Sequence, residues 1–132
     1  MKRIVLIDDD QTTNALNKLI IEKSELVDEV VLFAEAEKAL KFLDAEEVSY
    51  ERGEQKSLIL LDINMPIMNG WDFLEEYTKL NGATIDHKIV LLTSSIDPSD
   101  VNKAEKYERV SDYKSKPLSF DLLQSLVEKY LN

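Results

Sequence analysis

Side chains that can bind a cation or a phosphoryl group follow four separate stretches of β-favouring residues in this 132-residue chain. Three consecutive acids, 8–10, follow the first stretch, and Asp62 follows another. Thr93 and Lys116 come after two further stretches. Because adjacent carboxylates repel one another and a carboxylate beside apolar residues is costly without a partner, these acids predict a site and not surface charge alone.

The residue types indicate phosphoryl and metal chemistry. Clustered carboxylates bind hard divalent cations through oxygen, and Mg²⁺ is the natural choice when water and a phosphoryl group complete an octahedron. A carboxylate can also act as a nucleophile and form an aspartyl phosphate. Phosphoryl transfer needs charge neutralisation and alignment, which a cation, a lysine and a hydroxyl such as that of Thr93 can supply. Asp10 has a simpler interpretation, because aspartate is favoured as the cap before a first helical turn.

Five short runs of β-favouring residues precede these side chains or lie between them. The first four runs are continuous and not alternating, which is typical of parallel strands covered on both faces. The fifth is weaker and polar, which suits an edge strand. The predicted strands are 4–7, 30–33, 58–61, 89–92 and 113–115.

Apolar residues at helical spacing occur between and after the strands. They predict one helix after each strand, with Asn81-Gly82 as the end of the third helix and Ser119 as the cap of the last. The polar stretch 46–57 is interpreted as the end of the second helix and a surface loop. The stripes are Ala15, Leu16, Leu19 and Ile20; Ala36, Ala39, Leu40 and Leu43; Phe73, Leu74, Tyr77 and Leu80; Val101, Ala104 and Tyr107; and Phe120, Leu123, Leu126, Val127 and Tyr130.

Five strand–helix repeats predict an α/β fold, a doubly wound sandwich with right-handed crossovers. In such sheets ligands bind beyond the carboxyl ends of the strands, so the acids, Thr93 and Lys116 are expected at one edge. The formal charge of −10 argues against nucleic acid or an anionic membrane as a partner. The chain has no cysteine, which excludes thiolate chemistry. We therefore expect a soluble, cytoplasmic, single domain over residues 1–132.

The motifs in their order resemble those of a known family. Residues 4–9 resemble the first strand and acidic pair of the response-regulator receiver domain, the phospho-acceptor module of two-component signalling. Residues 60–66 with Met68-Asn69-Gly70 resemble its phosphoacceptor strand and the loop that follows, and 91–94 resemble the strand with the switch hydroxyl. Tyr113 and Lys116-Pro117 resemble its switch aromatic and lysine–proline pair. The resemblance covers essentially the whole chain and implies a flavodoxin-like (βα)5 sandwich with a five-stranded parallel sheet in the order 2-1-3-4-5.

The resemblance also implies a role for each residue at the strand ends. Asp62 corresponds to the phosphorylated aspartate, and Mg²⁺ would be held by Asp62, by Asp9 directly, by Asp8 through water and by the backbone carbonyl of Asn64. Lys116 would pair with the phosphoryl oxygens. Thr93 would reach the phosphoryl group once it is present, with Tyr113 turning inward behind it, so that a local charge change selects between two packings.

By the same resemblance the protein is a signalling switch and not an enzyme, apart from its self-catalysed phosphorylation and dephosphorylation. The phosphoryl donor would be a histidine kinase or a histidine phosphotransfer protein, because His87 is expected at the wrong end of its strand. The chain stops after the fifth helix, so we expect no output domain. The signal would then pass by docking to an unknown downstream protein or by phosphorelay.

One enzymatic alternative stays open at this point. Residues 8–12 also fit the D-x-D-x-T motif of haloacid-dehalogenase-type phosphatases, in which Asp8 would be the nucleophile. Those enzymes need a further acidic pair after the lysine, and here only Asp121 and Glu128 follow Lys116. A flavodoxin-type electron carrier is disfavoured, because three aspartates would repel the flavin phosphate.

Overall fold

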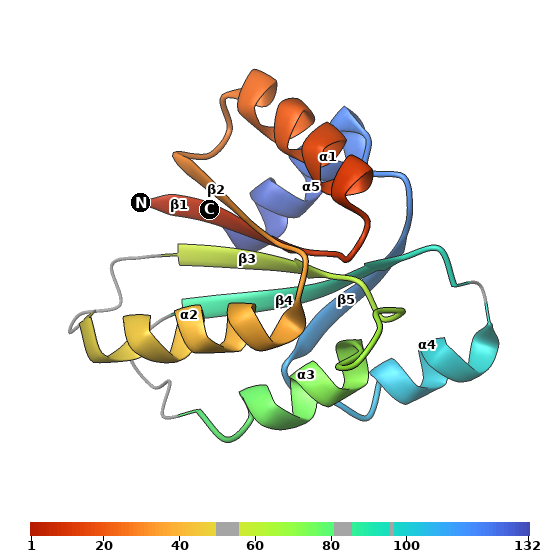
Figure 1. Ribbon diagram of the computed structural model, residues 1–132. Coiled ribbons are helices and arrows are strands. Elements are labelled where there is room, and N and C mark those ends of the chain that lie inside the picture. The colour runs from red at the N-terminus through yellow and green to blue at the C-terminus, as the bar shows by residue number, and fades with distance from the viewer. Residues whose placement is uncertain (50–55, 81–85, 96) are drawn as a thin grey trace.

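Strands and helices alternate along the chain in a computed structural model that describes residues 1–49, 56–80, 86–95 and 97–132 (Figure 1). Each strand is followed by one helix, as the repeats predicted. The strands are β1 (Lys2–Ile7), β2 (Glu29–Phe33), β3 (Lys56–Leu61), β4 (Asp86–Thr93) and β5 (Val110–Ser115). The helices are α1 (Gln11–Ser24), α2 (Ala36–Ser49), α3 (Gly70–Tyr77), α4 (Pro98–Ala104) and α5 (Phe120–Tyr130).

The five strands form one parallel sheet in the order β2-β1-β3-β4-β5, which confirms the predicted fold class and strand order. The register aligns the carboxyl ends of the strands. Ile7 pairs with Leu61 across β1 and β3, and Thr93 pairs with Ser115 across β4 and β5. The residues that follow these pairs therefore leave the sheet along one edge.

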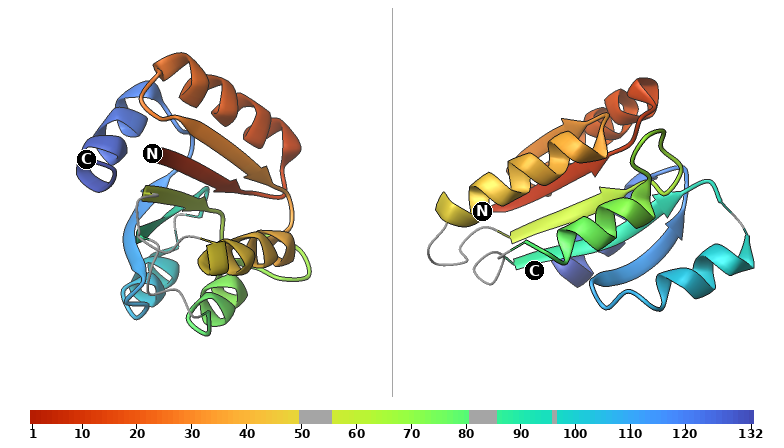
Figure 2. Two further views of the ribbon diagram at one scale, coloured as in Figure 1. Left: turned by 90° about the vertical axis from the view of Figure 1, so that its left-hand side faces the viewer. Right: turned by 60° about the horizontal axis from the view of Figure 1, so that its bottom comes forward.

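Helices cover both faces of the sheet, with α1 and α5 on one side and α2, α3 and α4 on the other (Figures 1 and 2). Alternate residues of a strand belong to the hydrophobic cores on opposite faces of the sheet. In β1, Val5 and Ile7 join the core under α2 and α3, while Ile4 and Leu6 join the core under α1 and α5. This double burial explains why the strand runs are continuously apolar.

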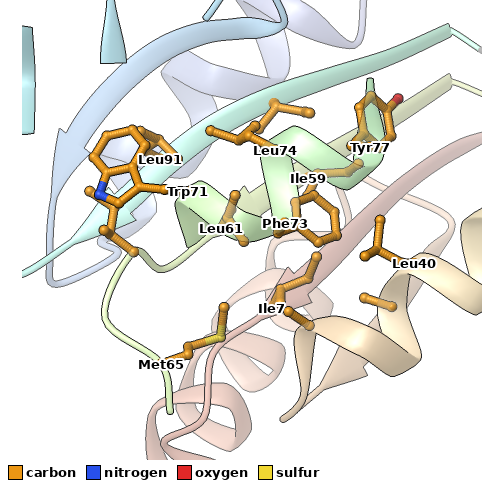
Figure 3. Close-up of a cluster of buried hydrophobic side chains, with 14 of the residues drawn as sticks. Ile7, Leu40, Ile59, Leu61, Met65, Trp71, Phe73, Leu74, Tyr77 and Leu91 are labelled. Atoms are coloured by element: carbon orange, nitrogen blue, oxygen red, sulfur yellow. The ribbon is translucent and has the colours of Figure 1, made fainter. Parts of the chain in front are cut away.

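The core under α3 is the more aromatic of the two, and Figure 3 shows its side chains meeting the sheet. Phe73 is fully buried, and its ring stacks on Tyr77 with 5.9 Å between the centroids. Trp71 is also buried at the start of the same helix and stacks on Tyr107 at 5.6 Å. The stripe predicted for this helix is therefore correct, and it fixes α3 close to the strand ends.

The stripe predicted for α1 is wrong at three of its four residues, and only Ile20 is half-buried and packs against the core. Leu16 and Leu19 are about half exposed, and Ala15 is exposed as well. The buried residues are instead Asn14, Asn17 and Ile21. Hydrogen bonding explains why this side of the helix faces inward, because the Asn14 amide donates to the carbonyl of Asp8 at 2.8 Å and to that of Phe33 at 3.3 Å. Helix α1 turns this side inward to pair backbone carbonyls at the strand ends, which would be costly to bury unpaired.

Smaller differences concern other element ends. β5 begins at Val110, three residues before the predicted run, and Phe120 at the start of α5 is 48% exposed although it was placed in the apolar stripe. Ser119 caps α5 as predicted. Helix α2 extends to Ser49 and β3 begins at Lys56, while Asn81-Gly82 and residues 50–55 lie outside the described residues. Among the residues that are described, no helix has the length and apolarity needed to cross a membrane.

Candidate functional site

Two neighbouring strands deliver their carboxylates to the same edge of the sheet. Asp8 follows β1 and Asp62 follows β3, and the pairing of the residues before them makes them neighbours. Both are 6% exposed, whereas Asp9 beside them is exposed. Carboxylate oxygens of Asp8, Asp9 and Asp62 lie within 4.8 Å of one another. These three acids thus form a compact group of oxygen ligands. Asp10 is not part of it and instead caps α1, where its carboxylate accepts hydrogen bonds from the backbone N–H groups of Thr12 and Thr13.

Lys116 neutralises part of this acidic cluster. Its Nζ lies 2.5 Å from Asp8 Oδ2 and 3.6 Å from Asp62 Oδ2. The Lys116 backbone N–H donates to the carbonyl of Thr93 at 2.9 Å, which ties the residue to the end of β4, and the following Lys116–Pro117 bond is cis. One ammonium therefore serves two carboxylates from different strands.

The charges at the site perturb one another. Burial raises the pKa of Asp62 above its usual value, the negative Asp8 raises it further, and Lys116 only partly opposes both. For Lys116, burial acts to lower the pKa, but the hydrogen bond and charge of Asp8 together with Asp62 outweigh it and raise the pKa. The carboxylates in the site therefore still lack positive charge, which a bound cation can supply.

The raised pKa of Asp62 predicts a pH-dependent cost to stability. The folded protein binds the Asp62 proton more tightly than the unfolded chain, in which the pKa of this group is near 3.8. The contribution of Asp62 to the stability of the folded state therefore falls as the pH rises from 3.8 through the pKa of the folded protein. With EDTA present, we expect the free energy of unfolding of Asp62→Asn to increase relative to that of wild type as the pH rises from 4 to 7. Urea denaturation of both proteins at the two pH values measures this change.

The matched control is Asp97→Asn at the cap of α4. Hydrogen bonds from Ser99 lower the pKa of Asp97, so wild type should become more stable relative to this variant as pH rises. A parallel pH dependence for the two variants would contradict the sign assigned to Asp62.

The hydroxyl of Thr93 is fully buried at the carboxyl end of β4. Its Oγ1 accepts from the backbone N–H of Ser95 at 3.2 Å, and the Tyr113 hydroxyl donates to the Ser95 carbonyl at 3.1 Å. Ser95 Oγ in turn donates to Asp100 Oδ2 on α4 at 2.5 Å. Ser95 thus connects the two predicted switch residues to α4, and nothing in its sequence context had pointed to it.

The segment after β3 is held tightly against the strand end. Gly70 N–H donates to the Ile63 carbonyl at 2.8 Å, and a Cβ at this position would lie only 2.7 Å from the Asp62 carbonyl oxygen and 2.8 Å from Ile63 Cα. Asn69 and Asp72 form a reciprocal cap at the start of α3. Asn64 is exposed, and its N–H lies 3.4 Å from Asp62 Oδ1. This close approach fixes the backbone that carries Asp62.

His87 lies far from the site. It is the second residue of β4, is 6% exposed, and its Nδ1 lies 2.6 Å from the Tyr77 hydroxyl. Thr93, six residues further along the strand, is at the site. At the rise of an extended strand the two ends are about 20 Å apart.

A family comparison and one sequence relative both show that the chain is similar to response regulators. The sequence profile of the response regulator receiver domain matches residues 4–128. The probable C4-dicarboxylate response regulator DctR of Halalkalibacterium halodurans is 30% identical over 128 residues, which are 97% of this chain and 50% of that protein. The chain therefore spans about half the length of this relative.

Solved structures agree on the fold. A two-component response regulator from Cytophaga hutchinsonii is 34% identical and superposes with a TM-score of 0.84, covering 100% of this chain and 98% of the other. A response regulator receiver protein from Dyadobacter fermentans is 26% identical with a TM-score of 0.86, and the match covers 99% and 98% of the two chains.

Proposed function

The chain belongs to the response regulator receiver domain family, and from that premise we propose that it accepts a phosphoryl group on Asp62 with the help of Mg²⁺. The observation that supports this most is that Asp62 is buried in a cluster with the buried Asp8 and the exposed Asp9, and that Lys116 contacts both buried carboxylates. A phosphoryl group on this oxygen would lie beside the ammonium that offsets its charge. Labelling by acetyl phosphate tests this assignment.

The donor atoms fit a hard cation. We assign Mg²⁺ to Asp8, Asp9, Asp62 and the backbone carbonyl of Asn64, because clustered carboxylate and carbonyl oxygens are what such an ion prefers. When bound, the ion supplies positive charge to the phosphoryl oxygens. The chain's own residues do the rest: Asp62 provides the nucleophilic oxygen, and Lys116 holds a phosphoryl oxygen.

Mg²⁺ should stabilise the folded protein, since a ligand that binds only the folded state shifts unfolding by mass action. At an ion concentration well above its dissociation constant we expect the melting temperature to rise by about 5 °C. The Asp9→Asn variant should lose most of this rise, because it keeps the fold and the Lys116 contacts but removes the exposed ligand. Differential scanning calorimetry with and without MgCl₂ measures the effect.

The control for this prediction is NaCl at the same ionic strength, which screens the repulsion between the acids without coordinating them. Equal stabilisation by NaCl, or an equal rise in Asp9→Asn, would contradict a coordinated ion.

We assign the switch to Thr93 and Tyr113. When the Thr93 hydroxyl moves to a phosphoryl oxygen it leaves the Ser95 N–H, and Ser95 also accepts the Tyr113 hydroxyl at its carbonyl. Movement at the strand end is thereby passed to β5 and to α4. The partners that read this change are unidentified proteins.

The phosphoryl donor is proposed to be a separate histidine kinase or phosphotransfer protein. Supporting this, His87 is buried near the amino end of β4, about 20 Å from the site by strand rise, so it cannot deliver a phosphoryl group to Asp62 of its own chain.

A further inference from the structure

Helix α4 is weakly attached to the rest of the molecule. Ala104 is the one buried residue in the helix, and Val101 is 37% exposed. A groove of about 800 Å³ separates Thr78, at the end of α3, from Ser99 and Asn102 on α4, so the neighbouring helices are not packed along their lengths (Figure 1). Elements with few buried apolar contacts move most readily. The position of α4 therefore depends on a small number of individual contacts.

One of these contacts is an aromatic stack just beyond the end of α4. The ring of Tyr107, three residues after the helix, stacks on Trp71 of α3 with 5.6 Å between the centroids and 21° between the planes. The Tyr107 hydroxyl donates to Glu75 Oε1 on α3 at 3.1 Å. Lys103 Nζ on α4 lies 4.8 Å from the centroid of the Trp71 ring. We call these four side chains, Trp71, Glu75, Lys103 and Tyr107, the α3–α4 latch.

The α3 side of the latch is joined to the aspartate proposed to accept the phosphoryl group. Trp71 is 9% exposed and directly follows Gly70. The Gly70 N–H donates to the Ile63 carbonyl at 2.8 Å, and a Cβ on Gly70 would lie only 2.7 Å from the Asp62 carbonyl oxygen. Because these are backbone contacts, a shift of the backbone at Asp62 is passed to the start of α3 and to Trp71.

The α4 side of the latch is joined to the proposed switch. Asp100, in the first turn of α4, accepts from Ser95 Oγ, and the Ser95 N–H donates to Thr93 Oγ1. Helix α4 is thus held through Ser95 at its start and by the latch near its end. When the Thr93 hydroxyl leaves Ser95 for a phosphoryl oxygen, the latch is the contact that still opposes a movement of α4.

We propose that the α3–α4 latch stabilises the resting position of α4 and opens when Asp62 is phosphorylated. The proposal rests on phosphoryl acceptance at Asp62 and on the switch assigned above. A contact that exists in only one of two states favours that state, so weakening the latch should favour the phosphorylated form. The coupling is reciprocal, so occupation of Asp62 should in turn loosen the packing around Trp71.

Beryllofluoride with Mg²⁺ is the probe, because it binds a carboxylate with the shape and charge of a phosphoryl group. Three variants dissect the latch. Tyr107→Leu removes the stack and the hydroxyl, Tyr107→Phe removes only the hydrogen bond to Glu75, and Lys103→Met removes only the charge beside Trp71. Isothermal titration calorimetry gives the affinity of each variant for beryllofluoride without relying on the tryptophan.

Phe42→Leu is the matched control. The Phe42 ring packs on Phe33 of β2 with 5.3 Å between the centroids, and the Arg3 guanidinium carbon lies 5.2 Å from the Phe42 centroid. This substitution therefore also removes an aromatic pair and a neighbouring cation, but its ring partners lie on β1 and β2 and not on α4. A general loss of packing should affect both kinds of variant alike, whereas loss of the latch should not.

Tyr107→Leu should bind beryllofluoride about three- to tenfold more tightly than wild type, as expected for loss of one stack and one hydrogen bond from the resting state. Lys103→Met and Tyr107→Phe should each bind about twofold more tightly, and Phe42→Leu should stay within about 1.5-fold of wild type. An unchanged or weaker affinity in Tyr107→Leu, or an equal gain in Phe42→Leu, would overturn the proposal.

Acrylamide quenching of Trp71, the only tryptophan of the chain, tests the reciprocal effect. In wild type the quenching constant should rise about twofold at saturating beryllofluoride and Mg²⁺, whereas Tyr107→Leu should show the higher value without the probe. A wild-type constant that stays the same at saturation would overturn the latch. If wild type binds no beryllofluoride and acetyl phosphate does not label it, phosphoryl acceptance at Asp62 itself is refuted.

Discussion

We expect Asp62→Asn to take up no phosphoryl group from acetyl phosphate and Mg²⁺, whereas wild type should take up one. The amide nitrogen and oxygen of asparagine cannot replace the nucleophilic carboxylate oxygen, so the initial rate should fall by about a thousandfold or more. The substitution keeps size and shape, and it removes one of three repelling acids, so the variant should fold normally. Intact-mass spectrometry gives the number of groups added, and loss of the adduct in hydroxylamine identifies an acyl phosphate.

Asp8→Asn is the informative control, because Asp8 lies in the same cluster and is the nucleophile of the phosphatase alternative. We expect it to be labelled still, though more slowly, since it loses a cation ligand and the 2.5 Å contact with Lys116. The opposite pattern, with labelling normal in Asp62→Asn and lost in Asp8→Asn, would support the phosphatase mechanism instead.

Gly70→Ala should destabilise the fold by about 2 to 4 kcal/mol. The added Cβ would lie 2.7 Å from the Asp62 carbonyl oxygen and 2.8 Å from Ile63 Cα, and both are backbone atoms that cannot rotate away. Relief requires α3 to move from β3 or the backbone of Asp62 to shift. Urea denaturation measures the loss of stability.

The same substitution should lower the rate of phosphorylation by acetyl phosphate under conditions where the variant is fully folded, because the clash is against the residue that carries the nucleophile. Glu76→Ala on the exposed side of α3 serves as the control, since it removes only a surface pair with Lys79 and should change stability by less than about 0.5 kcal/mol. Equal effects of the two substitutions would contradict the close packing at Gly70.

The sheet was predictable because its three central strands, β1, β3 and β4, are buried on both faces, so that each is an uninterrupted run of apolar residues in the sequence. Helix α1 was not, because its buried side is set by Asn14, whose amide pairs with strand-end carbonyls. A hydrophobic stripe cannot reveal a contact of that kind. The weak run 113–115 gave β5 too late a start, since its first residues alternate between exposed and half-buried positions and look like loop.

The assembly of the site followed from the same principle. Parallel strands end at one edge, so Asp8, Asp62, Thr93 and Lys116 were expected together, and the register brings them there. Ser95 was not predicted, because its importance lies in hydrogen bonds to Thr93, Tyr113 and Asp100 that depend on three-dimensional geometry. The stack of Tyr107 on Trp71 was equally hidden, since one ring belongs to α3 and the other follows α4, and their spacing in the sequence does not indicate that they meet.

The contact of Lys116 with Asp8 joins residues 108 positions apart in the sequence. During synthesis the first strand leaves the ribosome many seconds before the last, at typical rates of about 5–20 residues per second. Until β5 has emerged and paired, the acids of the first and third strands lack their lysine. A nascent chain therefore carries these acids before the ammonium that offsets part of their charge, and the charge cluster is complete only once the last strand is in place.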